Sequence, residues 1–387
     1  MCENPITDLN VIYESATKAV NSCSFKYQNQ LLETNQLLYT AQLEDEIEKF
    51  LYHLTMGQRF RINERGKVRE ITSNAMRDKV AIHLLVDEVL SPALERYLIP
   101  TNSASRKGKG TSQFREQVVK DLESAFREYG LDAVITIIDF KGFYGSIPQR
   151  QCLASLSKLL IRSVNEETYR YTVYLMSECM ENFRRELKSE IGVDIGNQFS
   201  QSVGTGYPIP FDNRMKIVYG VKRCGRYNDD VYFITRTAEE AREILDGLLE
   251  VVKMLGLTLN TKKTQIHSIS KPFKLLQYTY WVEPTGRVVR KISKTTVTRE
   301  RRKLKAYKRL LDKGRMTYPQ IECAFKGWIA SSYRYMSFRQ IGNMTRLYYQ
   351  LFGRIPKWKR HGRLRWLMAQ SLKNWDLTET ISSATQK

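Results

Sequence analysis

The sequence RYNDDVYFI (residues 226–234) places two adjacent carboxylates, Asp229 and Asp230, directly before a run of aromatic and β-branched residues. Asn and Asp accept the left-handed backbone of a tight turn, and the run that follows is typical of a strand. Adjacent carboxylates repel each other, so a divalent cation is the obvious means of keeping both ionised. Taken alone, the stretch would also suit an ordinary Asp-rich hairpin turn.

A second stretch, AVITIIDFKGFYGSI (residues 133–147), delivers Asp139 to the end of a buried strand, because its first half is dominated by β-branched residues. Two such strands, joined through a helical connection, can bring Asp139 and Asp229 to one divalent ion. The backbone carbonyl of Phe140 is placed as a further oxygen ligand. Magnesium favours sites with few carboxylates, several waters and substrate phosphates, and two such ions support in-line displacement at phosphorus.

These two blocks resemble the catalytic palm motifs of reverse transcriptases, and the resemblance extends over residues 60–350. The nearest relatives in motif wording are bacterial group II intron, retron, diversity-generating and defence-associated enzymes. The resemblance implies an α+β right-hand polymerase with fingers, a palm built on an antiparallel sheet, and a helical thumb. It implies that Asp139, Asp229 and Asp230 are the catalytic residues and metal ligands. The cofactor would be two Mg²⁺ ions, with Mn²⁺ as an alternative.

A basic segment, residues 58–71, alternates polar and apolar side chains around a central turn, which predicts a hairpin. The resemblance makes it the fingers hairpin, in which Lys67 and Arg69 contact the incoming deoxynucleotide triphosphate and Arg61 adds a third cation. Charge builds up as pyrophosphate leaves, so several nearby cations suit this role. Without the resemblance, a solvated basic hairpin would explain the same residues.

Three further positions match nucleotide contacts of the family. Tyr144 matches the steric gate that packs where a ribonucleotide carries its 2′-hydroxyl, although core packing would also explain it. Gly196, in the block IGNQFSQ (residues 195–201), would permit close approach of backbone to nucleotide or template. Lys263 matches the lysine of the fourth palm motif and could neutralise the leaving pyrophosphate, or it is a plain surface lysine.

Two stretches resemble primer and template contacts. NSASRKGKGT (residues 102–111) is a small basic loop before a helix, suited to a template phosphate or to a flexible surface loop. FKLLQYTYW (residues 273–281) resembles the primer-grip hairpin. The matching residues are Arg106, Lys107, Lys109, Leu276, Gln277 and Tyr278.

Composition favours a polyanion partner. The 387 residues carry 62 Lys+Arg against 41 Asp+Glu, a net charge of +21. We find no apolar run near membrane-spanning length and no signal peptide, so we expect a cytoplasmic protein, bacterial or phage-encoded, without a membrane partner. The six cysteines show no CxxC pair and are expected to be reduced thiols.

The predicted organisation is a helical N-terminal extension (1–58), fingers and palm (59–283), a helical basic thumb (284–380) and a disordered tail (381–387). The basic and aromatic C-terminal segment suits gripping of an A-like duplex.

The predicted function is RNA-directed DNA synthesis from deoxynucleotide triphosphates. The expected partners are an RNA template, in particular a structured non-coding RNA, the DNA product, and an oligomer or second protein subunit. Antiphage defence is the first expectation for the biological role, because the chain is compact and carries unusual motif variants. Ile195 and Gln201, which stand where the family usually has Gln and Pro, resemble diversity-generating enzymes and make diversity generation the alternative. A non-catalytic nucleic-acid-binding protein on a polymerase fold and a two-metal nuclease are the rival classes.

Overall fold

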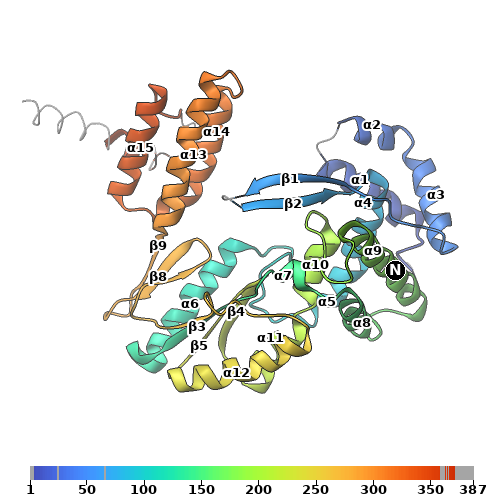
Figure 1. Cartoon of the computed structure of the whole chain (residues 1–387), viewed down its shortest axis with the longest axis horizontal. Coiled ribbons are helices and arrows are strands. Elements are labelled where there is room, and N and C mark those ends of the chain that lie inside the picture. The colour runs from blue at the N-terminus through green and yellow to red at the C-terminus, as the bar shows by residue number, and fades with distance from the viewer. Residues whose placement is uncertain are drawn as a thin grey trace, which may run out of the picture. The chain divides into compact units, whose positions relative to one another are not determined.

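The computed structural model describes residues 4–23, 26–64, 67–357, 362, 364 and 366–370 (Figure 1). The chain forms two compact units, Met1–Ile269 and Ser270–Lys387, which are described here one at a time. The boundary between the two units, after Ile269, lies before the palm–thumb boundary that the sequence predicts at residue 283. The predicted boundaries of the extension, fingers, palm and thumb stay predictions. The predicted tail, residues 381–387, lies outside the described residues.

A four-stranded antiparallel sheet forms the centre of the first unit. Its strands are β3 (Val134–Asp139), β4 (Arg223–Tyr227), β5 (Asp230–Thr235) and β6 (Gln265–Ser268), in the order β4-β5-β3-β6. Every residue of β3 is buried, as its β-branched run predicts. This sheet, with helices packed on it, confirms the predicted α+β polymerase fold.

Two helices cover the sheet: α6 (Thr111–Tyr129) packs on β4 and β5, and α12 (Ala238–Met254) packs on β3 and β5. Successive residues of β5 alternate between them. The hydroxyl of Tyr232 donates to Asp121 of α6 at 2.8 Å, whereas Val231 and Phe233 belong to the same buried cluster as the apolar face of α12. The alternation expected of a strand therefore holds, with both faces covered.

The predicted basic hairpin is confirmed as β1 (Gln58–Glu64) and β2 (Lys67–Ser73), paired in antiparallel register from Gln58↔Ser73 to Glu64↔Lys67. Its base is anchored by hydrogen bonds. The amide of Gly57 donates to Oε1 of Glu186 at 2.8 Å, and the amide of Thr72 donates to the carbonyl of Ile195 at 3.1 Å.

Helices complete the first unit. In chain order they are α1 (Leu9–Ser22), α2 (Lys26–Thr34), α3 (Gln36–Glu48), α4 (Met76–His83), the π-helix η1 (Leu84–Leu90), α5 (Ser91–Glu95), the 3₁₀ turn η2 (Gly130–Asp132), α7 (Phe143–Ser146), α8 (Gln149–Leu160), α9 (Glu166–Leu187), α10 (Gln198–Gly206), α11 (Ile209–Asn213) and the π-helix η3 (Arg214–Val218). Ile12 of α1 and Ile47 of α3 lie in the same buried cluster as Val80 and Leu84. The N-terminal helices therefore share one buried cluster with α4 and η1, which follow the basic hairpin in the chain.

The second unit begins with a three-stranded antiparallel sheet of β7 (Phe273–Leu275), β8 (Tyr278–Val282) and β9 (Val288–Ile292). Residues 288–292 correct the prediction that the basic segment from 284 onward is helical. Val289 and Ile292 are buried while Lys291 is exposed, so this part of the segment is a strand paired with β8.

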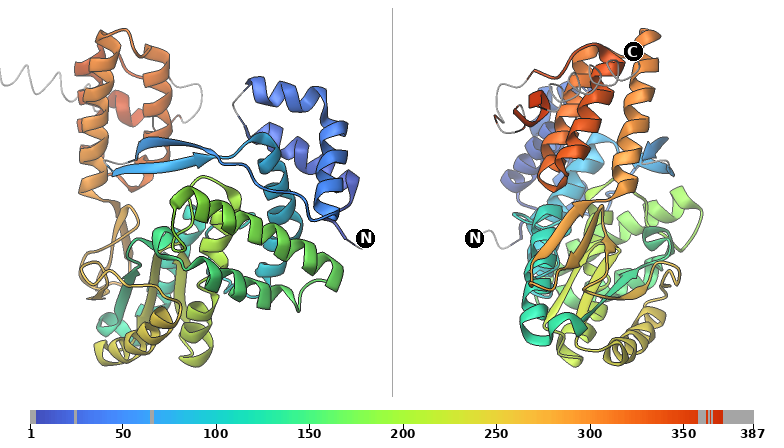
Figure 2. Two further views of the ribbon diagram at one scale, coloured as in Figure 1. Left: turned by 45° about the vertical axis from the view of Figure 1, so that its right-hand side comes forward. Right: turned by 90° about the vertical axis from the view of Figure 1, so that its left-hand side faces the viewer.

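The rest of the second unit is helical: α13 (Lys294–Asp312), α14 (Tyr318–Ser332), the 3₁₀ turn η4 (Tyr333–Tyr335) and α15 (Phe338–Phe352). Figure 2 shows these three α-helices side by side. Leu304, Ile321, Phe325 and Tyr348 are buried on these helices, and the rings of Phe325 in α14 and Tyr348 in α15 stack with 4.5 Å between their centroids. Of the helices in the described part of the chain, none is both long and apolar enough to cross a membrane.

Candidate active site

Three aspartates come together at one edge of the sheet. The pairing of β3 with β5 puts Asp139 directly opposite Asp230. Tyr227 pairs with Asp230 across β4 and β5, so Asn228 and Asp229 form the tight turn between the strands. Asn228 has a φ of 54°, the left-handed conformation that asparagine tolerates better than most residues. The sequence RYNDD therefore folds into the predicted turn.

Burial and neighbouring negative charge oppose the ionisation of Asp229 and Asp230. Burial, followed by the charges of Asp229 and Asp139, raises the pKa of Asp230 to about 7. Burial also raises the pKa of Asp229, and the charge of Asp139 adds to this rise. A divalent cation would relieve this repulsion, since hard cations take carboxylate oxygens as ligands.

The donor set fits magnesium by its chemistry, with three carboxylates on two paired strands and the adjoining turn. Within the described residues, however, no three His, Cys, Asp or Glu side chains are grouped so that they could hold a metal ion. The carboxylate of Asp139 is paired instead with Lys263, whose Nζ donates to Oδ1 at 2.7 Å and to Oδ2 at 3.0 Å. This hydrogen bond raises the pKa of Lys263, so the lysine keeps its proton.

Lys263 reaches Asp139 because a turn follows the bridge between Phe140 and Leu259. The amide of Asn260 donates to the carbonyl of Asp139 at 2.7 Å, and the amide of Lys141 donates to the carbonyl of Thr258 at 2.8 Å. Neither bond uses the carbonyl of Phe140, which the sequence predicts as a metal ligand.

Tyr144 lies close to the aspartates and packs against α10. A Cβ added at Gly204 would lie 2.6 Å from the Tyr144 hydroxyl, so only glycine leaves room for the ring there. Burial, with the charge of Asp229, raises the pKa of Tyr144 to about 12, so the phenol stays neutral. The predicted sugar gate is thus held between the catalytic turn and one helix.

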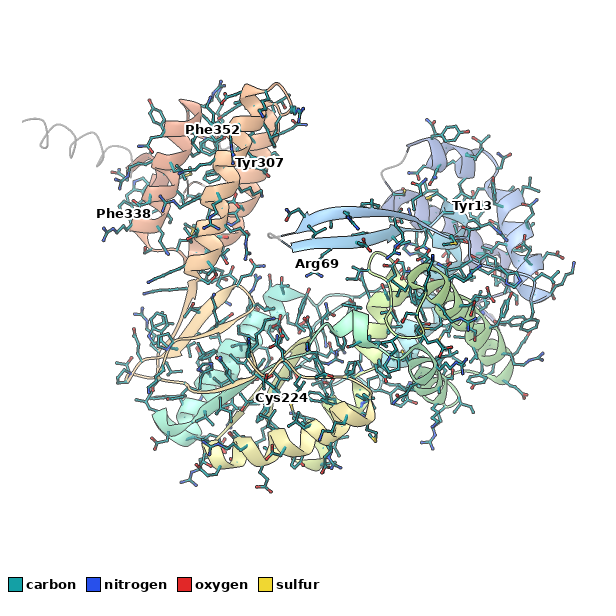
Figure 3. All side chains as sticks on the ribbon, in the orientation of Figure 1. Tyr13, Arg69, Cys224, Tyr307, Phe338 and Phe352 are labelled. Carbon is teal, nitrogen blue, oxygen red and sulfur yellow. The ribbon has the colours of Figure 1, made fainter. Side chains whose placement is uncertain are left out.

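The predicted fingers cations differ in their surroundings. Burial raises the pKa of Asp229 and of Tyr144, and the positive charge of Arg69 acts against this rise at both groups. In Figure 3 the side chain of Arg69 points from β2 away from β1. Arg61 is paired with Glu70, with 2.9 Å between the guanidinium and the carboxylate. The side chain of Lys67 lies outside the described part of the molecule.

Gly196 makes its close approach to the hairpin base. It has a φ of 141°, and an added Cβ would lie 2.3 Å from the carbonyl oxygen of Thr72 in β2. Asn197, the next residue, accepts from the amide of Ser200 at 2.8 Å and so caps α10. The block IGNQFSQ therefore joins the fingers hairpin to the helix that supports Tyr144.

The predicted template loop is held mostly by its own contacts. The guanidinium of Arg106 pairs with Glu95 and donates to the carbonyl of Asn102 at 2.7 Å. Lys109 donates to the carbonyl of Pro100 at 2.9 Å, whereas Lys107 is exposed. Arg106 and Lys109 thus shape the loop, and their contact with a template stays a prediction.

The predicted primer-grip residues belong to the second unit. Leu276, with a φ of 53°, and Gln277 form the turn between β7 and β8. The carbonyl of Gln277 accepts from the amide of Ser293 at 3.0 Å, and the ring of the buried Tyr278 meets Tyr335 edge-on. The turn is therefore fixed to the start of α13.

One element of the site escaped the sequence analysis. Arg226 is fully buried, and its Nε lies 2.9 Å from both carboxylate oxygens of Asp212. Its other nitrogens donate to the carbonyls of Gly204 at 3.0 Å and Thr205 at 2.6 Å. The pair fixes the strand before the catalytic turn to α10 and α11. The available signal was the arginine directly before the Tyr-Asn-Asp-Asp turn, near the end of the short segment RCGRY (residues 223–227).

Comparison with known proteins gives one family. The family model described as "Reverse transcriptase (RNA-dependent DNA polymerase)" matches residues 62–280, and no curated protein matches the chain. A structure of telomerase from Candida albicans in complex with a TWJ fragment of telomeric RNA is similar at 12% identity and a TM-score of 0.45, over 88% of this chain and 65% of that one. A structure of apo telomerase from Candida tropicalis, truncated from the C-terminal domain, is similar at 15% identity and a TM-score of 0.45, over 61% of this chain and 55% of that one.

The chain thus spans less than two thirds of either telomerase chain, and likeness at this level carries no argument about activity. The match to the family model is a separate finding from the likeness to the telomerase structures. It includes β3 with Asp139, the turn with Asp229 and Asp230, and Lys263, and it covers more than half of the sequence. The chain belongs to the reverse transcriptase (RNA-dependent DNA polymerase) family.

Proposed function

We propose that this protein is an RNA-directed DNA polymerase that extends a primer 3′-hydroxyl with deoxynucleotides. The observation that carries the proposal is the pairing of Asp139 with Asp230 across β3 and β5, with Asp229 in the adjoining turn, in a chain of the reverse transcriptase family. Catalysis of this kind relies on positioning and on cations that stabilise negative charge at the phosphoryl group, and acidic side chains would serve by holding those cations in place.

The aspartates would hold two Mg²⁺ ions, which when bound neutralise phosphate charge and lower the pKa of the attacking hydroxyl. Lys263 keeps its proton and supplies a positive charge beside Asp139. Arg69 supplies another charge near Asp229 and suits the triphosphate. Tyr144, neutral and fixed against α10, would exclude a 2′-hydroxyl and so select deoxynucleotides.

For the biological role we propose the copying of a dedicated, structured non-coding RNA in antiphage defence, within the bacterial cytoplasm. The net charge of +21 supports an RNA partner, and the described cysteines are free thiols, as a reducing compartment requires. Diversity generation remains the second role, favoured by Ile195 and Gln201. A neighbouring template repeat and variable-protein gene would identify it.

Primer extension on an RNA template tests the activity. Asp229→Asn should reduce the rate by at least about a hundredfold, because one of the carboxylates proposed to hold Mg²⁺ is lost. The matched control is Asp246→Asn, which changes an exposed aspartate on α12 and should leave the rate unchanged. Wild-type protein that binds RNA without synthesising DNA would indicate the non-catalytic class, and shortening of the primer or template would indicate a nuclease.

A further inference from the structure

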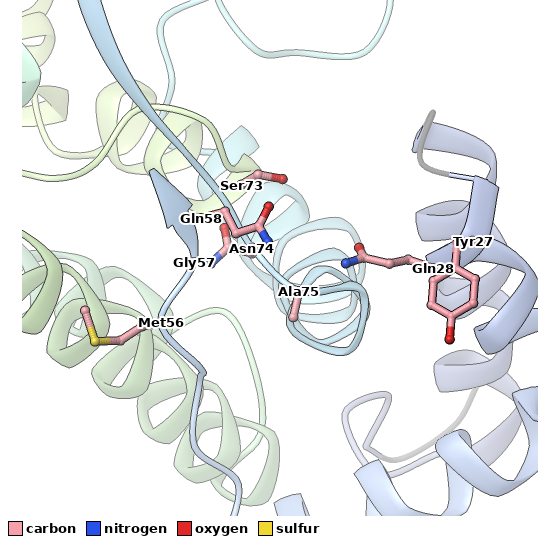
Figure 4. A pocket seen from close by; sticks show the side chains of 8 residues that line it. All are labelled: Tyr27, Gln28, Met56, Gly57, Gln58, Ser73, Asn74 and Ala75. Atoms are coloured by element: carbon pink, nitrogen blue, oxygen red, sulfur yellow. The ribbon is translucent and has the colours of Figure 1, made fainter. Parts of the chain in front are cut away.

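A cavity of about 450 Å³ lies at the base of the fingers hairpin, apart from the proposed polymerase site. It lies between α2, the start of β1 and the junction of β2 with α4. Its lining residues are Tyr27, Gln28, Met56, Gly57, Gln58, Ser73, Asn74 and Ala75 (Figure 4). This volume is within the range of sites that hold a small ligand. None of the lining residues matches a catalytic, nucleotide, primer or template position of the family.

Asn74 is the unusual group in this cavity. Its side chain is only 4% exposed, yet among the described residues neither Nδ2 nor Oδ1 has a hydrogen-bond partner. Both atoms are closed to solvent in the structure, so a ligand reaches them when the Asn74 side chain turns toward the cavity. Leaving a buried amide unpaired is costly, which favours a ligand that offers both an acceptor and a donor. An asparagine amide presents a donor and an acceptor side by side, which matches the N7 and N6 edge of adenine.

The cavity offers two further features that suit a nucleotide. Tyr27 is 76% exposed, so an aromatic face is available at the rim for a flat ring, and Met56, which is 63% exposed, lies on the opposite side of the hairpin base (Figure 4). Ala75 is the N-cap of α4 and has no side-chain oxygen, so the first amides of the helix are left without a side-chain cap. Unsatisfied amides at a helix N-terminus attract phosphate.

We propose that this cavity binds one unpaired nucleotide of an RNA strand, with the base edge on Asn74, the base face on Tyr27 and the phosphate near the start of α4. Adenine is the base that fits. In Figure 4 the amide of Gln28 points from α2 toward Ala75, so a second polar group reaches the same space. The site goes beyond the proposed polymerase function, because it would hold RNA at the fingers base without taking part in nucleotide addition.

Photochemical labelling of the full chain locates the site. Irradiation with 8-azidoadenosine 5′-monophosphate should label peptides that contain Tyr27 or Met56, and unlabelled adenosine monophosphate should compete better than guanosine monophosphate. The Asp229→Asn protein should label equally well, so failure of the polymerase proposal would leave this test intact. Labelling confined to other peptides, or equal competition by both nucleotides, would overturn the assignment.

Affinity measurements test the two contacts. For a ten-residue oligoadenylate RNA, Asn74→Ala and Tyr27→Leu should each weaken binding by about fivefold to a hundredfold, the range expected for a bidentate base contact or one base stack. Tyr13→Leu, an exposed aromatic change on α1, is the matched control and should have no effect.

The same variants separate a ligand site from a structural role. Tyr27 is exposed, and Asn74→Ala removes only unpartnered groups, so both proteins should unfold at the wild-type temperature or above. Asn74→Ala with lowered stability and unchanged oligoadenylate affinity would show that Asn74 is structural. Equal weakening for adenylate, uridylate and cytidylate oligomers would show that no base is read. Unchanged RNA affinity in both variants would leave a protein segment as the occupant and overturn the proposal.

Discussion

Nζ of Lys263 lies 2.7 Å from Oδ1 of Asp139, so the first of the three proposed catalytic aspartates is paired with a lysine from the turn before β6. The lysine side chain is 57% exposed, whereas that of Asp139 is 11% exposed. An exposed partner makes a weak ion pair, which can open when a stronger cation arrives. We therefore expect Lys263 to compete with a metal ion for Asp139.

Lys263→Ala should lower the Mg²⁺ concentration for half-maximal activity by a measurable factor of up to about fivefold. The effect is small because an exposed ion pair contributes little free energy. The maximal rate should fall as well, since a positive charge beside the reacting phosphates is lost. A Mg²⁺ titration of primer extension measures both. Lys262→Ala, the adjacent exposed lysine, is the control. An unchanged Mg²⁺ requirement would mean that Lys263 does not compete with the metal ion.

Gly204→Ala should displace Tyr144, because the new Cβ would lie 2.6 Å from its hydroxyl and 2.9 Å from Cζ. We expect weaker discrimination between deoxynucleotides and ribonucleotides, in the same direction as Tyr144→Ala. Competing incorporation of the two sugars measures the ratio. Gly327→Ala is the control, because nothing lies within 4 Å of the added Cβ in α14. Normal discrimination by a folded Gly204→Ala protein would show that the ring is not the gate.

Asp194 gives a pH-dependent contribution to stability. Burial, with Glu186 nearby, raises the pKa of Asp194 from 3.8 to about 6. A raised carboxyl pKa means that the protonated form stabilises the fold; this contribution is complete below pH 3.8 and is lost as the pH rises through 6. Relative to Asp194→Asn, the wild-type free energy of unfolding should fall by on the order of 1 to 2 kcal/mol between pH 4.5 and pH 7.5. Urea unfolding at both values measures it, and parallel behaviour of the two proteins would contradict it.

The exposed basic face of α13 should bind duplex through phosphates. Arg301, Arg302 and Lys305 are exposed around the buried Leu304. Changing all three to alanine should lower primer–template affinity and reduce the slope of log affinity against log salt by about 0.9 for each lost phosphate contact. The choice of inserted nucleotide should not change. Equal slopes for wild type and variant would mean that this face does not contact nucleic acid.

Local patterns in the sequence were sufficient for much of this fold. The β-branched run before Asp139 and the Asn-Asp turn predicted two strands and a catalytic turn, because strand and turn preferences act over a few residues. The alternation around residues 64–66 predicted the fingers hairpin in the same way. Residues 288–292 (VVRKI) were misassigned because they were grouped with the Lys- and Arg-rich segment that follows them, although three of the five are β-branched.

Long-range contacts were not predictable in this manner. The bond from Lys263 to Asp139 joins residues 124 positions apart, and the contact of Gly196 with Thr72 depends on how a loop packs against the hairpin. The buried pair of Arg226 and Asp212 likewise leaves no periodic trace. Such contacts depend on the packed fold, so the sequence named the chemical groups of the site but not the partners that position them.

Single-nucleotide incorporation on a defined RNA template tests the central claim most directly. A DNA primer annealed to RNA is offered each of the four deoxynucleotides separately, with wild type and with Asp139→Asn. The proposal predicts that the wild type adds only the nucleotide complementary to the next RNA base, and that Asp139→Asn adds none while still binding the duplex. Addition that ignores the template, or equal addition by Asp139→Asn, would contradict it.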